Sequence, residues 1–176
     1  SASASIVHKN INYPGGQIVC VENTMDAMER LAHFSRVRSE AKIIGVTGSV
    51  GKTGTKEMLR LVLSEQGLVS ATEGNLNNHW GLPLSLARMP KNTEIGIFEM
   101  GMSGPGEIQL LSKIASPNIS IITTVQNAHK EFFQSIDDIV NEKAKIASGM
   151  IRGGMVLINR DDSTFKRLKM ALQTEG

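Results

Sequence analysis

A chain of 176 residues with 40% hydrophobic and 20% charged residues is long enough for one well-buried domain and too short for two large ones. Its 19 basic and 17 acidic residues are scattered along the chain and leave a formal net charge of +2, which argues against a nucleic-acid partner or a membrane surface. No apolar run approaches the ~20 residues of a membrane span, and the single cysteine, Cys20, excludes an internal disulfide. We therefore expect a cytoplasmic protein with small-molecule partners, no nucleic-acid partner and no membrane span.

Apolar segments and helical periods alternate along the chain. Segments rich in β-branched residues predict strands at residues 17–21, 42–47, 68–72, 95–100, 119–125 and 155–159. Apolar positions at helical spacing predict helices at residues 24–36, 56–66, 107–115 and 135–150. Strands separated by helices indicate an α/β fold with a mostly parallel sheet and helices on both faces.

A glycine-rich turn follows the strand at 42–47 and precedes a helix, which is the order of elements around a phosphate-binding loop (P-loop). Its residues are Gly48, Ser49, Val50, Gly51, Lys52, Thr53 and Gly54. Glycines let backbone N–H groups point at phosphate oxygens, the lysine neutralises the β- and γ-phosphates, and the threonine hydroxyl can bind Mg²⁺. The general pattern has a glycine where Val46 stands, and a simple turn with a solvated lysine is the alternative. The loop predicts ATP and Mg²⁺ as ligands.

Three asparagines, Asn75, Asn77 and Asn78, lie in the irregular stretch 73–81 after the strand at 68–72, which we call the asparagine loop. Their amide groups can orient a polar substrate. Asparagine and glycine also favour turns, so a turn-rich loop without a binding role is the alternative. Pro83 follows at a position that fits a helix start.

Further polar residues follow the ends of three predicted strands, namely Glu99, His129 and the pair Asp161 and Asp162. Glu99 resembles the acid that ends a Walker B strand and binds Mg²⁺, with an exposed strand-end acid as the alternative. A lone histidine after a strand, such as His129, is more often a surface residue. Because the carboxyl ends of parallel strands lie along one edge of an open sheet, we expect these groups to share an edge with the glycine and asparagine loops.

One lysine lies on the apolar side of the last predicted helix. Lys143 is at the centre of a stripe formed by Ile136, Ile139, Val140, Ile146, Ala147 and Met150. Glu142 and Lys145 fall toward the polar side, so helix geometry selects Lys143 as the inward residue. A lysine whose amine reaches past the stripe to solvent is the alternative.

Together these motifs resemble the Mur ligase family. The resemblance is carried by residues 45–58, by the asparagine loop with residues 81–84, and by the segment 99–108. It implies an ATP-dependent amide ligase of peptidoglycan precursor synthesis. In that family Thr53 and Glu99 would bind a first Mg²⁺, and His129 with a carbamylated Lys143 would bind a second. Lys52, Lys143 and His129 would then serve catalysis.

The pair Asn77 and Asn78 resembles a feature of one branch of the family. That branch adds D-alanyl-D-alanine (D-Ala-D-Ala) to a UDP-N-acetylmuramoyl-tripeptide (UDP-MurNAc-tripeptide). This branch implies that ATP activates the terminal carboxylate of the tripeptide as an acyl phosphate, which the amine of D-Ala-D-Ala attacks. Asn75, Asn77 and Asn78 would lie on the substrate side. A sister Mur ligase, a folylpolyglutamate synthase and a non-catalytic nucleotide-binding module are the alternatives.

The resemblance also implies a domain division. Residues 1–16 would be the tail of an N-terminal substrate-recognition domain, and residues 17–176 the first part of a central ATP-binding domain, with the C-terminal domain absent. Because that last domain closes over ATP in this family, we expect the chain alone to turn over little ATP.

Overall fold

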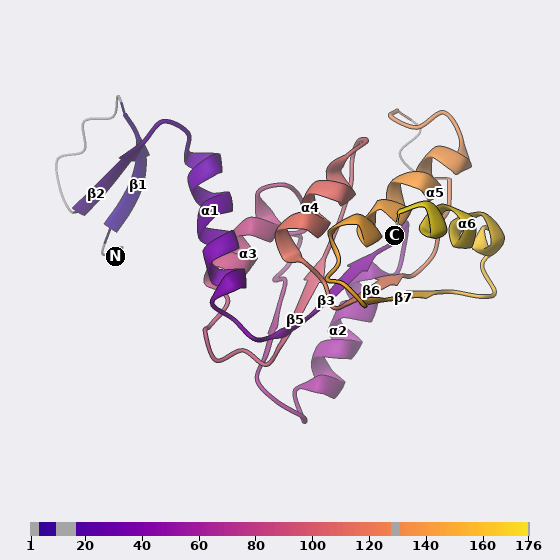
Figure 1. Ribbon diagram of the computed structural model, residues 1–176, viewed down its shortest axis with the longest axis horizontal. Coiled ribbons are helices and arrows are strands. Elements are labelled where there is room, and N and C mark those ends of the chain that lie inside the picture. Colours follow the sequence, from indigo (N-terminus) through magenta and orange to yellow (C-terminus); the bar gives the residue numbers. More distant parts are fainter. Residues whose placement is uncertain (1–3, 10–16, 128–130, 176) are drawn as a thin grey trace.

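A small parallel sheet precedes the main body of the chain. The computed structural model describes residues 4–9, 17–127 and 131–175. In it β1 (Ala4–His8) pairs with β2 (Gln17–Val21), and α1 (Thr24–Val37) leads from this pair to the larger sheet (Figure 1). The predicted strand at 17–21 is therefore present, but it pairs with the unpredicted β1 and not with the larger sheet.

Five parallel strands form the larger sheet in the order β4-β5-β3-β6-β7. They are β3 (Lys42–Thr47), β4 (Val69–Ala71), β5 (Ile95–Glu99), β6 (Ile119–Ile122) and β7 (Met155–Ile158). Each lies within its predicted range, which confirms the parallel sheet. The earliest of these strands, β3, is the central one, so the strand order reverses there, and ligands bind such sheets beyond the carboxyl ends at the point of reversal.

Helices cover both faces of this sheet, as predicted (Figure 1). One face packs on α2 (Lys52–Leu63). The other face packs on α3 (Gly81–Arg88), α4 (Glu107–Ala115), α5 (Ile136–Ala144), the 3₁₀ helix η1 (Lys145–Gly149) and α6 (Phe165–Glu175). No helix among these described segments is long and apolar enough to cross a membrane.

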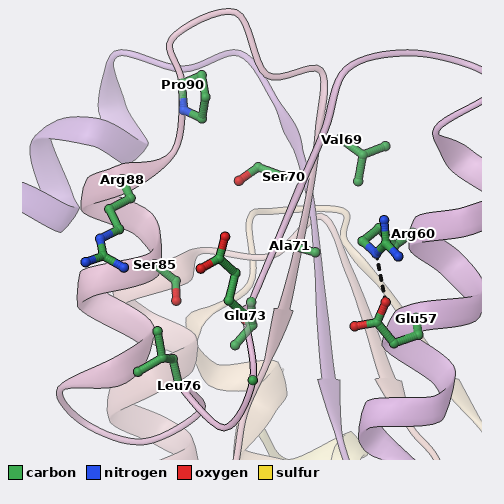
Figure 2. A pocket seen from close by; sticks show the side chains of 12 residues that line it. Glu57, Arg60, Val69, Ser70, Ala71, Glu73, Leu76, Ser85, Arg88 and Pro90 are labelled. Atoms are coloured by element: carbon green, nitrogen blue, oxygen red, sulfur yellow. Dashed lines mark hydrogen bonds and ion pairs between the residues drawn. The ribbon is translucent and has the colours of Figure 1, made fainter.

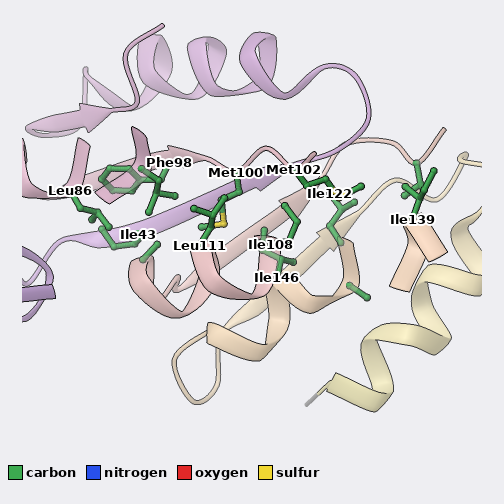
Figure 3. Close-up of a cluster of buried hydrophobic side chains, with 14 of the residues drawn as sticks. Ile43, Leu86, Phe98, Met100, Met102, Ile108, Leu111, Ile122, Ile139 and Ile146 are labelled. Atoms are coloured by element: carbon green, nitrogen blue, oxygen red, sulfur yellow. The ribbon is translucent and has the colours of Figure 1, made fainter. Parts of the chain in front are cut away.

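Alternating side chains along β3 divide the core into two clusters. Ile43 belongs to the larger cluster, which lies between the sheet and the helices α3 to α6 (Figure 3). Ile44 and Val46 belong to the smaller cluster beneath α2. Full burial of one such side chain stabilises the fold by about 1.5–3 kcal/mol, so the two clusters hold β3 and its following loop in the middle of the sheet.

Several helix boundaries differ from the predictions. α2 begins at Lys52, one turn before the predicted residue 56, because Gly51 at a φ of 84° turns the chain directly into the helix. The helix predicted at 135–150 begins with the expected capping box of Ser135, but it is α-helical only to Ala144 and ends as η1. No residue range was predicted for α3 or α6, but the expectation that Pro83 fits a helix start is confirmed, since it lies in the first turn of α3.

The tight winding of η1 accompanies a close backbone contact with α4. A Cβ atom placed on Gly149 would lie 2.2 Å from the carbonyl carbon of Ser112. Contacts this short do not occur between ordinary side chains and backbone, so packing on α4, which local sequence does not specify, determines how this segment is wound.

Gly149→Ala should therefore lower the free energy of unfolding by about 1–3 kcal/mol, because the added methyl group must push η1 away from α4. Urea unfolding followed by circular dichroism measures the change. Gly104→Ala is the matched control, since a Cβ there meets no atom within 4 Å. Equal stability of the two variants would contradict the close contact.

Candidate functional site

The glycine loop between β3 and α2 has the geometry of an anion-binding turn. Gly48 and Gly51 have φ angles of 152° and 84°, which favour glycine. A Cβ on Gly48 would lie 1.9 Å from Oγ1 of Thr123, so this glycine also lets the loop approach the end of β6. No described side chain caps the N-terminus of α2, which leaves its first backbone N–H groups directed at the space where a phosphate would bind.

The end of β6 supports the loop through hydrogen bonds. The backbone N–H of Ser49 donates to the carbonyl oxygen of Thr124 at 2.9 Å, and the Thr123 hydroxyl donates to the carbonyl oxygen of Val50 at 2.6 Å. Val46 explains the departure from the general pattern, because it is a buried residue of β3 beneath α2 and the turn begins only at Gly48. A glycine at position 46 would remove a core side chain.

The predicted phosphate-binding lysine lies across this loop. Nζ of Lys52 donates to the carbonyl oxygen of Gly48 at 2.9 Å. The ammonium group is thus next to the backbone that would surround a phosphate, as the prediction requires. A bound anion would compete with this carbonyl for the same cation.

Glu99 joins the glycine loop to the asparagine loop. Its side chain is 2% exposed at the end of β5. One carboxylate oxygen accepts a hydrogen bond from the hydroxyl of Thr53 at 2.9 Å, and the other accepts from the amide of Asn77 at 2.7 Å. The backbone N–H of Glu99 donates to Oγ1 of Thr72 at 3.1 Å. The acid is therefore buried and fully engaged, unlike the exposed strand-end acid that was the alternative.

The three predicted substrate asparagines occupy different environments. The side-chain amide of Asn77 donates a hydrogen bond to Glu99, and the backbone carbonyl oxygen of Asn77 accepts a hydrogen bond from the N–H of Gly101 at 2.7 Å. Oδ1 of Asn78 accepts from the N–H of Gly81 at 2.9 Å, so its side chain holds the start of α3. Asn75 is exposed at the tip of the loop. Two of the three thus shape the loop, and Asn75 is the one that faces solvent.

Lys143 faces inward, as the helical period predicted. Its side chain is 1% exposed, and Nζ contacts the sulfur of Met102 at 3.9 Å. Burial, and next the positive charge of Lys52, lower the pKa of Lys143 to about 7, while the carboxylate of Glu142 opposes the shift. A substantial fraction of this amine is therefore neutral at physiological pH.

The prediction that Glu142 lies on the polar side of its helix is wrong. Glu142 is 2% exposed, accepts a hydrogen bond from the N–H of Ile108 at 3.1 Å, and pairs with Lys145 at 2.9 Å. The reason is that α5 packs between α4 and α6 and is covered on more than one side. The carboxylate lies at the N-terminus of α4, where a negative charge is favourable.

In the aspartate pair after β7, Asp162 accepts hydrogen bonds from backbone N–H groups. Oδ2 of Asp162 accepts from the N–H of Val125 at 3.1 Å, and Oδ1 accepts from the N–H of Thr164 at 2.8 Å. Burial by itself would raise the pKa of Asp162, but the hydrogen bonds from Thr164 and Val125 hold this pKa below its usual value. This residue ties the end of β6 to the start of α6. The predicted metal ligand His129 lies outside the described residues.

One buried cation next to the site escaped the sequence analysis. Lys56 is 1% exposed, and Nζ donates to the carbonyl oxygen of Thr72 at 2.7 Å. The available signal was its place in line with Leu59 and Leu63, at i, i+3 and i+7 on the inner stripe of the helix predicted at 56–66.

A polar cavity of about 640 Å³ lies along the outer edge of β4, between α2 and α3 (Figure 2). Glu57 and Arg60 line it from α2, and Glu73 and Arg88 line it from the opposite side. Lys143 does not line this cavity. The described residues contain no group of three His, Cys, Asp or Glu side chains that could hold a metal ion by themselves.

Comparison with known proteins gives a consistent result. The family model described as the Mur ligase middle domain matches residues 46–176. The UDP-N-acetylmuramoyl-tripeptide--D-alanyl-D-alanine ligase of Rickettsia prowazekii is 38% identical over 173 residues, which cover 98% of this chain and 38% of that protein. The ligase of the same name from Bacillus subtilis is 41% identical over 82% of this chain and 32% of its own length. The chain therefore spans less than two fifths of these relatives.

Solved structures agree with the sequence relatives. MurF from Acinetobacter baumannii superposes with a TM-score of 0.87 at 30% identity, over 96% of this chain and 37% of that one. The MurF ligase from Thermotoga maritima in complex with ADP gives 0.83 at 34% identity, over 97% of this chain and 40% of that one. A folylpolyglutamate synthetase from Helicobacter pylori gives 0.59 at 15% identity, over 88% of this chain and 47% of that one, a likeness of fold alone.

The lowered pKa of Lys143 predicts a pH dependence of stability. Between about pH 7 and pH 10 the unfolded chain binds the proton that the folded chain has lost, so the free energy of unfolding should rise with pH through this window. Lys143→Met should remove that rise, whereas Lys169→Met, at an exposed position of α6, should keep it. Urea unfolding at several pH values measures both. A parallel pH profile for wild type and Lys143→Met would show that Lys143 stays charged.

Proposed function

The chain belongs to the Mur ligase family, and we propose that it carries the nucleotide-binding part of an ATP-dependent ligase that joins D-Ala-D-Ala to UDP-MurNAc-tripeptide. The observation that carries the proposal is the carboxylate of Glu99, on which the hydroxyl of Thr53 and the amide of Asn77 converge. This contact joins the phosphate-binding loop to the asparagine loop, so that nucleotide and acceptor substrate would meet at one point.

The donor set of this site fits Mg²⁺. The carboxylate of Glu99 and the hydroxyl of Thr53 are hard oxygen ligands, 2.9 Å apart and next to the N-terminus of α2. Mg²⁺ usually takes few protein ligands and completes its shell with phosphate oxygens and water, so two ligands from the chain are enough. When bound, the ion would neutralise the developing charge on the phosphates. The ADP named for the relative from Thermotoga maritima supports nucleotide binding here.

The proposed reaction assigns a task to each residue of the loop. The free N–H groups at the start of α2 bind the phosphates, and Lys52 leaves the carbonyl of Gly48 to contact the β- and γ-phosphates. The γ-phosphoryl group passes to the terminal carboxylate of the tripeptide, giving an acyl phosphate and ADP. The amine of D-Ala-D-Ala then attacks the acyl carbon and phosphate leaves. Asn75, exposed at the tip of the asparagine loop, is the best placed of the three asparagines to contact substrate.

Lys143 is proposed to act as a carbamate. A neutral amine adds CO₂ and releases a proton, which turns a buried cation into a carboxylate-like oxygen ligand. The pKa near 7 and the lack of any anionic oxygen hydrogen-bonded to Nζ in the described structure both favour this conversion. Together with His129 it would bind a second Mg²⁺ near Lys52.

We also propose where the domains of such an enzyme meet and where it acts. Residues 1–16 were predicted as the tail of a substrate-recognition domain, but β1 and β2 pair with each other, which supports a boundary after Val21. The rest of the chain would be the first part of the central ATP-binding domain, acting in the cytoplasm.

Two other functions use the same loop. A folylpolyglutamate-type ligase would share the fold and Lys52, and the pair Asn77 and Asn78 is the feature that argues against it. A non-catalytic nucleotide-binding module would have no use for a buried, low-pKa Lys143. Formation of the Lys143 carbamate and substrate-dependent phosphate release in an enzyme of the relatives' full length would separate these possibilities.

Lys52→Ala should weaken ADP binding about tenfold or more and leave the fold intact, because its ammonium group binds a loop carbonyl and the residue belongs to neither of the two core clusters of the described chain. Isothermal titration calorimetry measures the affinity and circular dichroism checks the fold. Lys42→Ala, exposed at the other end of β3, is the control and should bind ADP like wild type. Unchanged affinity in Lys52→Ala would mean that the glycine loop is only a turn.

A carbamate on Lys143 should be visible directly. With ¹³C-labelled bicarbonate at mildly alkaline pH, the chain should give a carbamate carbon resonance that strengthens with Mg²⁺ and disappears in Lys143→Arg, whose guanidinium does not add CO₂. Lys169→Arg should retain the resonance. Persistence of the full signal in Lys143→Arg would assign the carbamate to another amine.

A further inference from the structure

We propose that Lys56 is a positioning residue for the metal site, holding Glu99 in place through Thr72. The proposal rests on the proposed function, since it concerns the site where Mg²⁺ and nucleotide would bind. Lys56 itself is buried below the cavity at the edge of β4 and has no direct contact with Glu99 among the described residues.

The contacts form a closed ring that starts and ends on α2. Nζ of Lys56 donates to the carbonyl oxygen of Thr72 at 2.7 Å. The hydroxyl oxygen of Thr72 accepts a hydrogen bond from the backbone N–H of Glu99 at 3.1 Å. The carboxylate of Glu99 accepts a hydrogen bond from the hydroxyl of Thr53 at 2.9 Å, and Thr53 lies one turn before Lys56 on the same helix. Each hydrogen bond limits where the next residue can lie.

Thr72 transmits position because both its backbone and its side chain are engaged. Its N–H donates to the carbonyl oxygen of Ile97 at 3.0 Å, and the residue is 2% exposed. The asparagine loop begins directly after it, and Asn77 of that loop binds the other oxygen of Glu99. Loss of the Lys56 contact would free the carbonyl of Thr72, which lines the cavity, so that water can replace the ammonium group there.

The nature of the buried group also favours a positioning role. An ammonium group taken out of water is costly unless it is paired and hydrogen bonded. Lys56 has one carbonyl and the carboxylate of Glu57 at 2.9 Å, and Glu57 is half-exposed at the rim of the cavity. A methionine of similar length would fill the same space without that cost, so the cation is better explained by what it holds than by packing alone.

A merely structural lysine and a positioning lysine predict different results for Lys56→Met. Both roles allow a change in stability. Only a positioning role predicts a selective loss of affinity for Mg²⁺. Residues that hydrogen bond to metal ligands and orient them typically contribute about tenfold or more to metal affinity. Nucleotide binding without metal depends on the backbone N–H groups of the glycine loop and on the ammonium group of Lys52, none of which takes part in the hydrogen bonds of the ring.

The experiment is calorimetric titration of ADP in the absence of Mg²⁺ and over a series of Mg²⁺ concentrations. Lys56→Met should bind ADP alone within about twofold of wild type but require about tenfold more Mg²⁺ to reach the same enhancement. Thr72→Val, which keeps the carbonyl but removes the hydroxyl, should give a similar defect. In the double variant the two effects should not add, because both act through one ring.

Two controls separate the ring from general effects. Glu57→Gln removes the ion pair but leaves the contact of Lys56 with Thr72, and it should keep the wild-type Mg²⁺ dependence. Gly149→Ala lowers stability far from the ring and should also keep it. If Lys56→Met does not fold, Thr72→Val decides alone, and a normal Mg²⁺ dependence in that variant overturns the proposal.

The outcomes also distinguish this proposal from the proposed function. If wild type binds ADP and Mg²⁺ strengthens the binding, while Lys56→Met has the wild-type Mg²⁺ dependence whatever its stability, the positioning role is overturned and the proposed function stands. If wild type itself binds no ADP, or binds it without any effect of Mg²⁺, the proposed function fails and the positioning role fails with it.

Discussion

The hydrogen bonding of the Glu99 carboxylate is the constraint on which the rest of the site depends. A buried carboxylate is tolerated only when its oxygens are satisfied, and here the partners are Thr53 and Asn77, which are 46 and 22 residues away in the chain. The cost of burying this charge is offset only when the glycine loop and the asparagine loop are both in place. One side chain thereby makes the positions of two loops interdependent.

The sheet brings these loops together through its register. β3 is the central strand, and its last residues pair on one side with the end of β5 and on the other with the end of β6. The turn that follows β3 is therefore flanked by Glu99 on one side and Thr123 on the other. In a parallel sheet all these residues emerge at one edge, so a ligand at the point of reversal is reached from several strands.

Three lysines surround this edge, and each is stabilised differently. Lys52 binds a loop carbonyl, Lys56 is paired with Glu57, and Lys143 is buried with a pKa near 7. Charges of one sign in a low-dielectric region repel strongly, which is why Lys52 contributes to the shift at Lys143. The arrangement favours polyanionic ligands at the glycine loop and a neutral form of Lys143 beside it.

The features that depend on local pattern could be predicted from the sequence, namely the five strands of the parallel sheet, the glycine loop before a helix, and the inward position of Lys143. Hydrophobic period and turn residues act over a few positions, so one chain is enough to identify them. Which distant groups meet follows from the three-dimensional packing and could not be predicted. This packing buried Glu142 against the N-terminus of α4, tied Asn77 to Glu99, and gave Lys56 a partner in Thr72. The fate of a polar side chain depends on what packs over it, and the covering elements come from parts of the chain that no local pattern connects.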